Sequence, residues 1–130
     1  MSRGLLDTSV LADHDRIDSA KLLDESVIAA ISLAELSAGP HATTDDPERP
    51  RRQDRLQWVV AHWDALPFDA DAARACGLIF AAVPRAGRTS RARVVDLLIA
   101  STALANDLPL YTRNPASLAG LEDLVQVHAV

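Results

Sequence analysis

The stretch from Val94 to Ala105 is so apolar that, as a helix, it should lie inside a fold, yet one carboxylate, Asp96, interrupts it. An ionised carboxylate that is buried without a partner costs several kcal/mol, which is comparable with the whole stability of a small domain. Asp96 therefore needs a basic side chain, an edge open to water or a metal ion. The alternative is structural: an aspartate at a helix start, where the helix dipole favours negative charge.

Two more carboxylates follow apolar runs of strand length. Gly4–Leu6 predicts a short buried strand and leads into Asp7, and the β-branched run Ser26–Ile31 predicts a second strand that leads towards Glu35. A fold that brings strand ends together would gather Asp7, Glu35 and Asp96. Side chains of these types at one place indicate a cation site.

Structural explanations also exist for these residues. Asp7 would then be only a charge at a helix start, and Thr8 and Ser9 would cap that helix instead of orienting a metal-binding carboxylate. The segment from Ser32 to Glu35 matches a capping box, in which serine and glutamate side chains satisfy the first backbone amides of a helix. Both roles can coexist if the helix faces the strand ends.

Helices and strands alternate along the rest of the chain, which predicts an α/β fold with a central parallel sheet and helices on both faces. In such sheets ligands bind beyond the carboxyl ends of the strands. The expected elements are a helix at Val10–His14, a turn at Ala20–Leu23, a helix stopped by Gly39-Pro40, a loop at His41–Arg52, a helix at Pro50–Trp63, a strand at Ala65–Phe68, a helix at Ala70–Arg85 capped by Asp69, a strand at Leu108–Thr112, a short helix or turn at Pro115–Leu121 and a strand at Leu124–Val127.

Length and composition narrow the class of protein. The 130 residues suit one domain, 1–130, with a net charge of −5 that argues against a uniformly basic surface for nucleic acid. No apolar run approaches the roughly 20 residues of a membrane helix, and a signal-peptide core is missing, so we expect a cytoplasmic protein without membrane contact. The single cysteine, Cys76, excludes an internal disulfide and a zinc site with two or more thiolates.

The basic residues are clustered and are almost all arginine. One cluster contains Arg49, Arg51, Arg52 and Arg55, and the other contains Arg85, Arg88, Arg91 and Arg93. Because the guanidinium group suits phosphate and carboxylate equally, each cluster could hold RNA or an acidic partner protein. A solvated face is the alternative for both.

Taken together, the motifs resemble the PIN-domain ribonucleases, and within them the VapC-type toxins of type II (VapBC) toxin–antitoxin pairs. The matching segments, in the order of the family, are Leu6-Asp7-Thr8-Ser9-Val10, Ser32-Leu33-Ala34-Glu35-Leu36, Asp96-Leu97-Leu98-Ile99-Ala100 and Thr112-Arg113-Asn114. The resemblance implies a three-layer α/β/α PIN-like fold and a metal-dependent endoribonuclease. It also implies a cognate VapB-type antitoxin that blocks the acidic pocket, and a homodimer.

The resemblance also assigns roles to residues. Asp7, Glu35 and Asp96 would be the metal ligands, Asn114 and Thr112 would line the catalytic site, and Thr8 and Ser9 would support it. One departure concerns position 117, where such toxins usually carry a further acid and this chain has Ser117. Either the second metal is held weakly, or Asn114, Ser117 and water replace the missing carboxylate. The candidates for contact with RNA or antitoxin are Arg91, Arg93 and Arg113.

The chemistry of the side chains fits this implication. Three oxygen ligands, with no Cys or His among them, favour Mg²⁺ or Mn²⁺ over zinc, and metal-assisted hydrolysis would leave a 5′-phosphate and a 3′-hydroxyl. The second hypothesis is a catalytically weak PIN-like module that holds RNA or a protein without cutting. A receiver-like phosphoacceptor domain is excluded, because it needs adjacent acids near the first strand and a late lysine, and the chain has neither.

Overall fold

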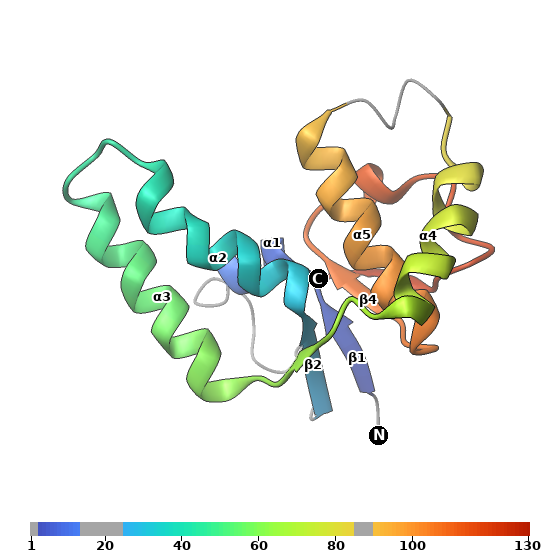
Figure 1. The fold of residues 1–130 in the computed structure, drawn as a ribbon, viewed down its shortest axis with the longest axis horizontal. Coiled ribbons are helices and arrows are strands. Elements are labelled where there is room, and N and C mark those ends of the chain that lie inside the picture. The colour runs from blue at the N-terminus through green and yellow to red at the C-terminus, as the bar shows by residue number, and fades with distance from the viewer. Residues whose placement is uncertain (1–2, 14–24, 85–89) are drawn as a thin grey trace.

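The structure is a computed structural model, and it describes residues 3–13, 25–84 and 90–130 (Figure 1). Its elements, in chain order, are β1 (Arg3–Leu6), α1 (Thr8–Ala12), β2 (Glu25–Ala29), α2 (Ala30–Ala42), α3 (Glu48–His62), β3 (Ala65–Leu66), α4 (Ala70–Ala82), α5 (Arg91–Ala105), β4 (Leu110–Thr112), the 3₁₀ helix η4 (Pro115–Leu118) and β5 (Val127–Ala129). No helix in these described ranges is both long and apolar enough to cross a membrane.

The strands form one five-stranded sheet in the order β3-β2-β1-β4-β5, and every adjacent pair is parallel. β1 is the central strand, where Leu5 is in register with Val27 of β2 and with Leu110 of β4. Parallel pairing requires a crossover between neighbouring strands, and helices supply most of these crossovers. The predicted parallel sheet is therefore confirmed, and the carboxyl ends of β1, β2 and β4 share one edge.

Helices cover both faces of the sheet, so the predicted three-layer α/β/α fold is confirmed (Figure 1). Successive strand residues point to opposite faces, and Leu5 and Leu6 accordingly belong to different cores. On one face Leu5 packs with α4 and α5, through residues such as Ile79 and Leu97. On the other face Leu6 packs with α1, α2 and α3. The predicted burial of the apolar stretch in α5 is correct, since Leu97, Ile99, Ala100 and Ala103 are fully buried.

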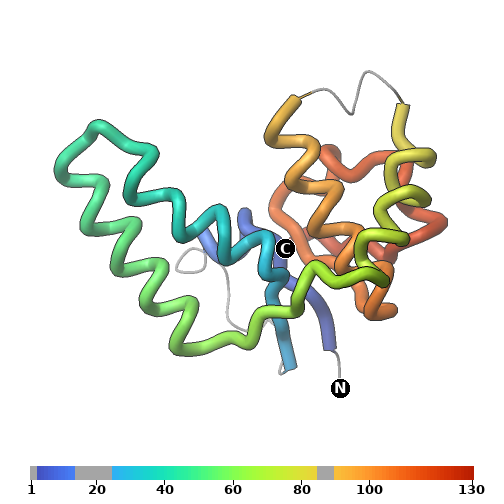
Figure 2. The backbone as a smooth tube through the Cα atoms, in the orientation of Figure 1, coloured from blue at the N-terminus to red at the C-terminus, as the bar shows by residue number. Residues whose placement is uncertain are grey.

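Helix α2 does not stop at Gly39-Pro40 as predicted, but continues to Ala42 with Pro40 buried inside it. A proline this close to the end of a helix removes only one backbone hydrogen bond. Two arginines of α3 then satisfy the last carbonyls of α2: Arg49 Nε donates to Pro40 O at 3.0 Å, and Arg52 donates to Gly39 O at 2.9 Å. Helices α2 and α3 consequently run side by side as an antiparallel pair (Figure 2).

Several predicted boundaries were wrong. The loop expected at His41–Arg52 is only the link from Thr43 to Pro47, because α3 already begins at Glu48. The last strand is Val127–Ala129 and not Leu124–Val127, since Leu124 and Val125 donate their amides to Leu121 O in a turn. The helix expected at Val10–His14 is Thr8–Ala12, and the helix expected at Ala70–Arg85 is Ala70–Ala82. Three strands are shorter than expected, namely those predicted at Ser26–Ile31, Ala65–Phe68 and Leu108–Thr112. The turn expected at Ala20–Leu23 lies outside the described residues, as do Arg85 and Arg88.

Candidate active site

Asp7 follows β1 directly and is the N-cap of α1. Its Oδ1 accepts hydrogen bonds from Ser9 N at 2.9 Å and from Val10 N at 3.4 Å, and also from the Ser9 hydroxyl. The side chain is nearly buried, with 6% of its surface exposed. Because every hydrogen bond found between this carboxylate and the described residues ends on Oδ1, the other oxygen, Oδ2, remains available to a ligand. The capping role and a ligand role are therefore compatible.

Ser9 links the end of β1 to the end of β4. Its hydroxyl donates to Asp7, accepts a hydrogen bond from Arg113 N at 3.0 Å and lies 3.4 Å from Thr112 Oγ1. Thr112 is fully buried, and its hydroxyl accepts from Asn114 N at 2.9 Å. Ser9 and Thr112 thus fix the backbone around Asp7. Capping of α1 by Thr8 and Ser9, the structural alternative for both residues, does not occur, because Asp7 itself is the cap.

The predicted capping box from Ser32 to Glu35 is wrong. The strand before it ends at Ala29, so α2 begins at Ala30 and Ser32 lies inside the helix, fully buried. Ser32 and Glu35 are one turn apart and both meet Thr8 of α1, whose Oγ1 lies 2.9 Å from Ser32 Oγ and donates to Glu35 Oε1 at 2.5 Å. Glu35 is exposed to solvent, and its carboxylate is held by Thr8, the residue that follows Asp7 in the chain.

Asp96 lies in the second turn of α5 and is not the helix-start aspartate considered as an alternative. The N-cap is Ser90, whose hydroxyl accepts from Arg93 N at 3.1 Å, and the first turn contains no acid. Burial is the main cause that raises the pKa of Asp96 to about 6, and the negative charges of Asp7 and Glu35 raise it further. A hydrogen bond with Ser117 and the charge of Arg93 oppose this shift in the pKa. The three carboxylates therefore interact electrostatically at the carboxyl edge of the sheet.

Ser117 and Asn114 follow the end of β4, and Ser117 bonds Asp96. Asn114 is exposed, and its carbonyl accepts from Ser117 N at 3.1 Å and from Ser117 Oγ at 2.8 Å. A hydroxyl group has one proton, so Ser117 can donate to Asn114 or to Asp96 but not to both at once. Position 117 therefore contributes a neutral oxygen to the site, next to the Asp96 carboxylate.

The donors at this site are chemically suited to a hard divalent cation. Asp7 Oδ2, Glu35 and Asp96 offer only carboxylate oxygens, which Mg²⁺ prefers. Burial contributes most to the raised pKa of Asp96, and the repulsion from Asp7 and Glu35 that adds to it is what a cation would relieve. In their present positions, however, no three Asp, Glu, His or Cys side chains in the described parts of the chain are grouped closely enough to hold a metal ion. The structure brings these acids to one edge without closing them around a point.

The three arginines predicted to contact RNA or an antitoxin have different environments. Arg91 is exposed on α5 and borders a groove of about 480 Å³ between α2 and α5. Arg93 is half-buried and acts on Asp96 through its charge. Arg113 Nε lies 3.8 Å from Asp13 Oδ2, in an ion pair that joins the end of β4 to the end of α1.

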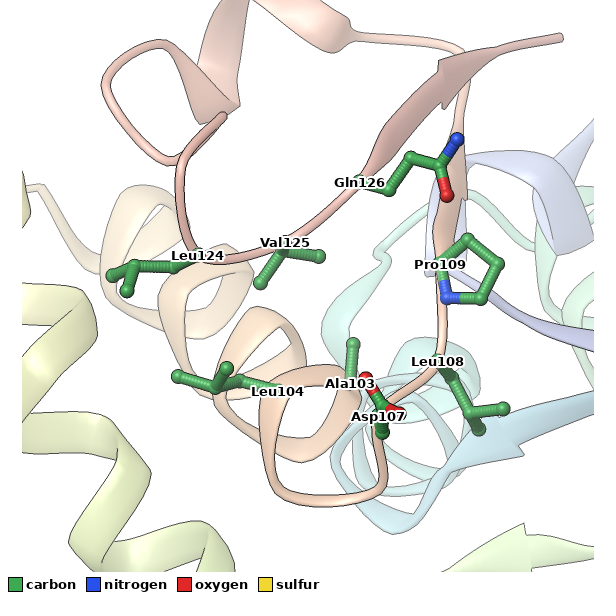
Figure 3. Close-up of a pocket in the computed structure, with 8 residues that line it drawn as sticks. All are labelled: Ala103, Leu104, Asp107, Leu108, Pro109, Leu124, Val125 and Gln126. Atoms are coloured by element: carbon green, nitrogen blue, oxygen red, sulfur yellow. The ribbon is translucent and has the colours of Figure 1, made fainter.

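A second, smaller cavity is unrelated to the acids. It has a volume of about 100 Å³ and lies at the other end of α5, between Leu104, Leu108 and Val125 (Figure 3). Asp107 is its one charged lining residue. This cavity offers little chemistry, and it lies at the amino end of β4, away from the carboxyl edge where the acids meet.

Two residues that matter for the site were not assigned to it from the sequence. Ser32 was interpreted as a helix cap, although its spacing of three residues from Glu35 already places both on one side of a helix. Asp13, the partner of Arg113, gave no signal in the sequence, because the contact joins residues that are a hundred positions apart.

Comparison with known proteins identifies relatives of this chain. The sequence model of the PIN domain matches residues 4–119. A member of the VapBC family of toxin–antitoxin systems, VapBC-5 from Mycobacterium tuberculosis, superimposes with a TM-score of 0.81 at 32% identity, covering 100% of this chain and 98% of that chain. FitAcB from Neisseria gonorrhoeae gives a TM-score of 0.72 at 25% identity over 95% and 94% of the two chains. VapBC2 from Rickettsia felis, bound to a DNA fragment from its promoter, shares the fold, with a TM-score of 0.75 at 21% identity over 98% of each chain. No curated protein sequence matches the chain.

Proposed function

Because this chain belongs to the PIN-domain family and resembles the VapC-type toxins within it, we propose that it is a divalent-metal-dependent endoribonuclease of a toxin–antitoxin pair. PIN domains of such toxins are in general nucleases that depend on divalent metal ions. The observation that carries the proposal is that three elements of the fold bring Asp7, Glu35 and Asp96 close enough to interact: burial is the main cause that raises the pKa of Asp96, and the charges of Asp7 and Glu35 raise it further. Repelling carboxylates at the carboxyl edge of a parallel sheet are the electrostatic condition for binding a cation.

The residues of the site would divide the work as follows. Asp7, through Oδ2, would hold Mg²⁺ or Mn²⁺ together with Glu35 and Asp96. A metal bound there would polarise the phosphoryl oxygen and lower the pKa of an attacking water. Thr8 keeps Glu35 turned towards the site, and Ser9 keeps the Oδ1 of Asp7 occupied so that Oδ2 is presented. Asn114 and Ser117 would face the substrate or a water. The products would carry a 5′-phosphate and a 3′-hydroxyl.

A protein partner is part of the proposal. The groove between α2 and α5 is lined by Ala38, Ala42, Ala92 and Val95, and it runs up to Glu35 and Arg91. An apolar surface that ends at an acidic site suits an antitoxin segment that carries apolar residues and a terminal arginine. We further propose that the toxin is a homodimer and acts in the cytoplasm. Isolation together with the product of a neighbouring gene tests both the partner and the oligomeric state.

One observation favours the alternative of a PIN-like module that binds RNA or protein but cuts weakly. Ser117 supplies a hydroxyl where related toxins usually have a further acid, so the site has three carboxylates available to a metal. A panel of RNAs incubated with Mg²⁺ or Mn²⁺ decides between the two functions. We expect cleavage by the wild-type protein that EDTA and Asp96→Asn abolish, whereas the matched control Asp71→Asn, in an exposed carboxylate of α4, cuts normally. Equal results for all four samples would refute the nuclease.

A further inference from the structure

A groove of about 240 Å³ adjoins the acidic site on the side of α3. It is bounded by α1, α2 and α3, and Thr8 and Glu35 belong both to the groove and to the site. Its remaining lining residues are Ala12, Leu36, Gly39, Arg52 and Arg55. A ligand that leaves the acidic site in this direction therefore meets two arginines and an apolar wall.

The two arginines are one turn apart on α3, so they present their side chains to the same side of the helix. Arg52 is fixed: it donates to Gly39 O at 2.9 Å, and its Nε lies 3.7 Å from Glu48 Oε1. Arg55 is half-buried but makes no hydrogen bond or ion pair with any described residue. A guanidinium that is partly removed from water, and whose donors bond to none of the described residues, is suited to binding an anion.

We propose that Arg55, supported by Arg52, binds a phosphate of the RNA backbone next to the phosphate that lies at the acidic site. The inference rests on the proposed function, because that function puts RNA at Thr8 and Glu35. A chain with a net charge of −5 has to attract RNA through local positive groups, and the planar fork of arginine matches the oxygens of phosphate. Ala12 and Leu36 offer the apolar surface on which a ribose or base can rest.

This position makes Arg55 a positioning residue rather than a catalytic one. It would hold the strand on one side of the scissile bond, so its loss should weaken substrate binding more than it slows the chemical step. The control for charge on the same helix is Arg51, which is exposed and forms an ion pair with Glu48, at 3.9 Å. An acidic side chain of a protein partner could also pair with Arg55, and the experiment has to separate that outcome from RNA binding.

The test measures binding of a labelled single-stranded RNA by fluorescence anisotropy, with Asp96→Asn in every sample to prevent cleavage. We expect Arg55→Ala to weaken binding about tenfold and to lower the salt dependence by about one phosphate contact, while Arg51→Ala changes affinity less than about twofold. Arg55→Lys keeps the charge but loses the fork, so its affinity should fall between the two. In the cleavage assay Arg55→Ala should raise KM by a similar factor and leave kcat almost unchanged.

A second experiment keeps Arg55 in place, so it does not depend on the folding of Arg55→Ala. It uses oligonucleotides in which one phosphate at a time is replaced by a neutral methylphosphonate, and it shows which phosphate Arg55 contacts. One replacement beside the cleavage position should cost the same tenfold, and it should cost nothing further in Arg55→Ala. The subsite is refuted if Arg55→Ala binds RNA as tightly as Arg51→Ala does, or if no single phosphate replacement weakens RNA binding. It is also refuted if Arg55→Ala loses binding to a protein partner but not to RNA. If Arg55→Ala cleaves RNA with an unchanged KM, the subsite alone is refuted. If the protein binds the phosphate through Arg55 but does not cleave RNA, the nuclease alone is refuted.

Discussion

Replacement of Asp96 by Asn should stabilise the protein at neutral pH, although we propose that this residue is a metal ligand. The pKa of this carboxyl is about 6 in the folded protein, above its ordinary value of 3.8. Between these two pH values the folded state binds more protons than the unfolded state, so the free energy of unfolding falls as the pH rises from about 4 to about 6. Above that range the full cost of the ionised carboxylate is present.

The size of this effect follows from the same two values. At about 1.4 kcal/mol for each pH unit, the difference between 3.8 and about 6 corresponds to about 3 kcal/mol. Asp96 is only half-buried, and water screens part of the repulsion from its neighbours, so we expect about 1–2 kcal/mol. Asp96→Asn has nearly the same shape as the protonated acid and should therefore gain this amount at pH 8 and almost nothing at pH 4.

Urea denaturation followed by circular dichroism, in metal-free buffers from pH 4 to pH 8, measures this gain. Asp54→Asn, in an exposed carboxylate of α3, serves as the control and should show no such dependence on pH. Millimolar Mg²⁺ should reduce or reverse the advantage of Asp96→Asn, because a ligand that binds only the folded wild-type protein stabilises it. A variant that is equally or less stable than the wild type at pH 8, without metal, would refute the electrostatic reasoning.

Three further substitutions have defined outcomes. Gly120 has a φ of +98°, and a Cβ there would lie 3.0 Å from Ala82 O, so Gly120→Ala should lower the free energy of unfolding by about 1–3 kcal/mol in urea denaturation; an unchanged midpoint would contradict this. Ser9→Ala removes a hydroxyl that bonds both Asp7 and Arg113 N, and should lower kcat at least tenfold with a smaller change in KM. Ser117→Asp adds a fourth acid and should tighten Mn²⁺ binding in isothermal titration, whereas unchanged binding would mean that Ser117 does not adjoin the metal.

The sequence was sufficient to predict the parallel sheet and the approach of three acidic residues at one edge of it, because both depend on local patterns. Short apolar runs followed by Asp7 and Glu35 indicated strands that end at one edge, and the apolar stretch around Asp96 indicated a buried helix. These patterns reflect burial and hydrogen-bonding capacity, which each segment carries in its own residues.

The incorrect predictions concern features that depend on contacts between distant segments. Pro40 remains inside α2 because Arg49 and Arg52, from the next helix, satisfy the carbonyls around it. Ser32 bonds Thr8 instead of a helix amide, since the strand before it ends earlier than its β-branched residues suggested. Local propensity contains no information about either partner.

The most direct test of the account is a titration of the metal-free protein with Mn²⁺, in which electron paramagnetic resonance measures the free ion. We expect the wild-type protein to bind Mn²⁺, Asp7→Asn, Glu35→Gln and Asp96→Asn each to bind it at least tenfold more weakly, and the control Asp71→Asn to bind it normally. If the wild-type protein binds no Mn²⁺, or if the three carboxylate variants bind it as tightly as the wild type and the control do, the three carboxylates do not form a metal site and the proposed nuclease is wrong.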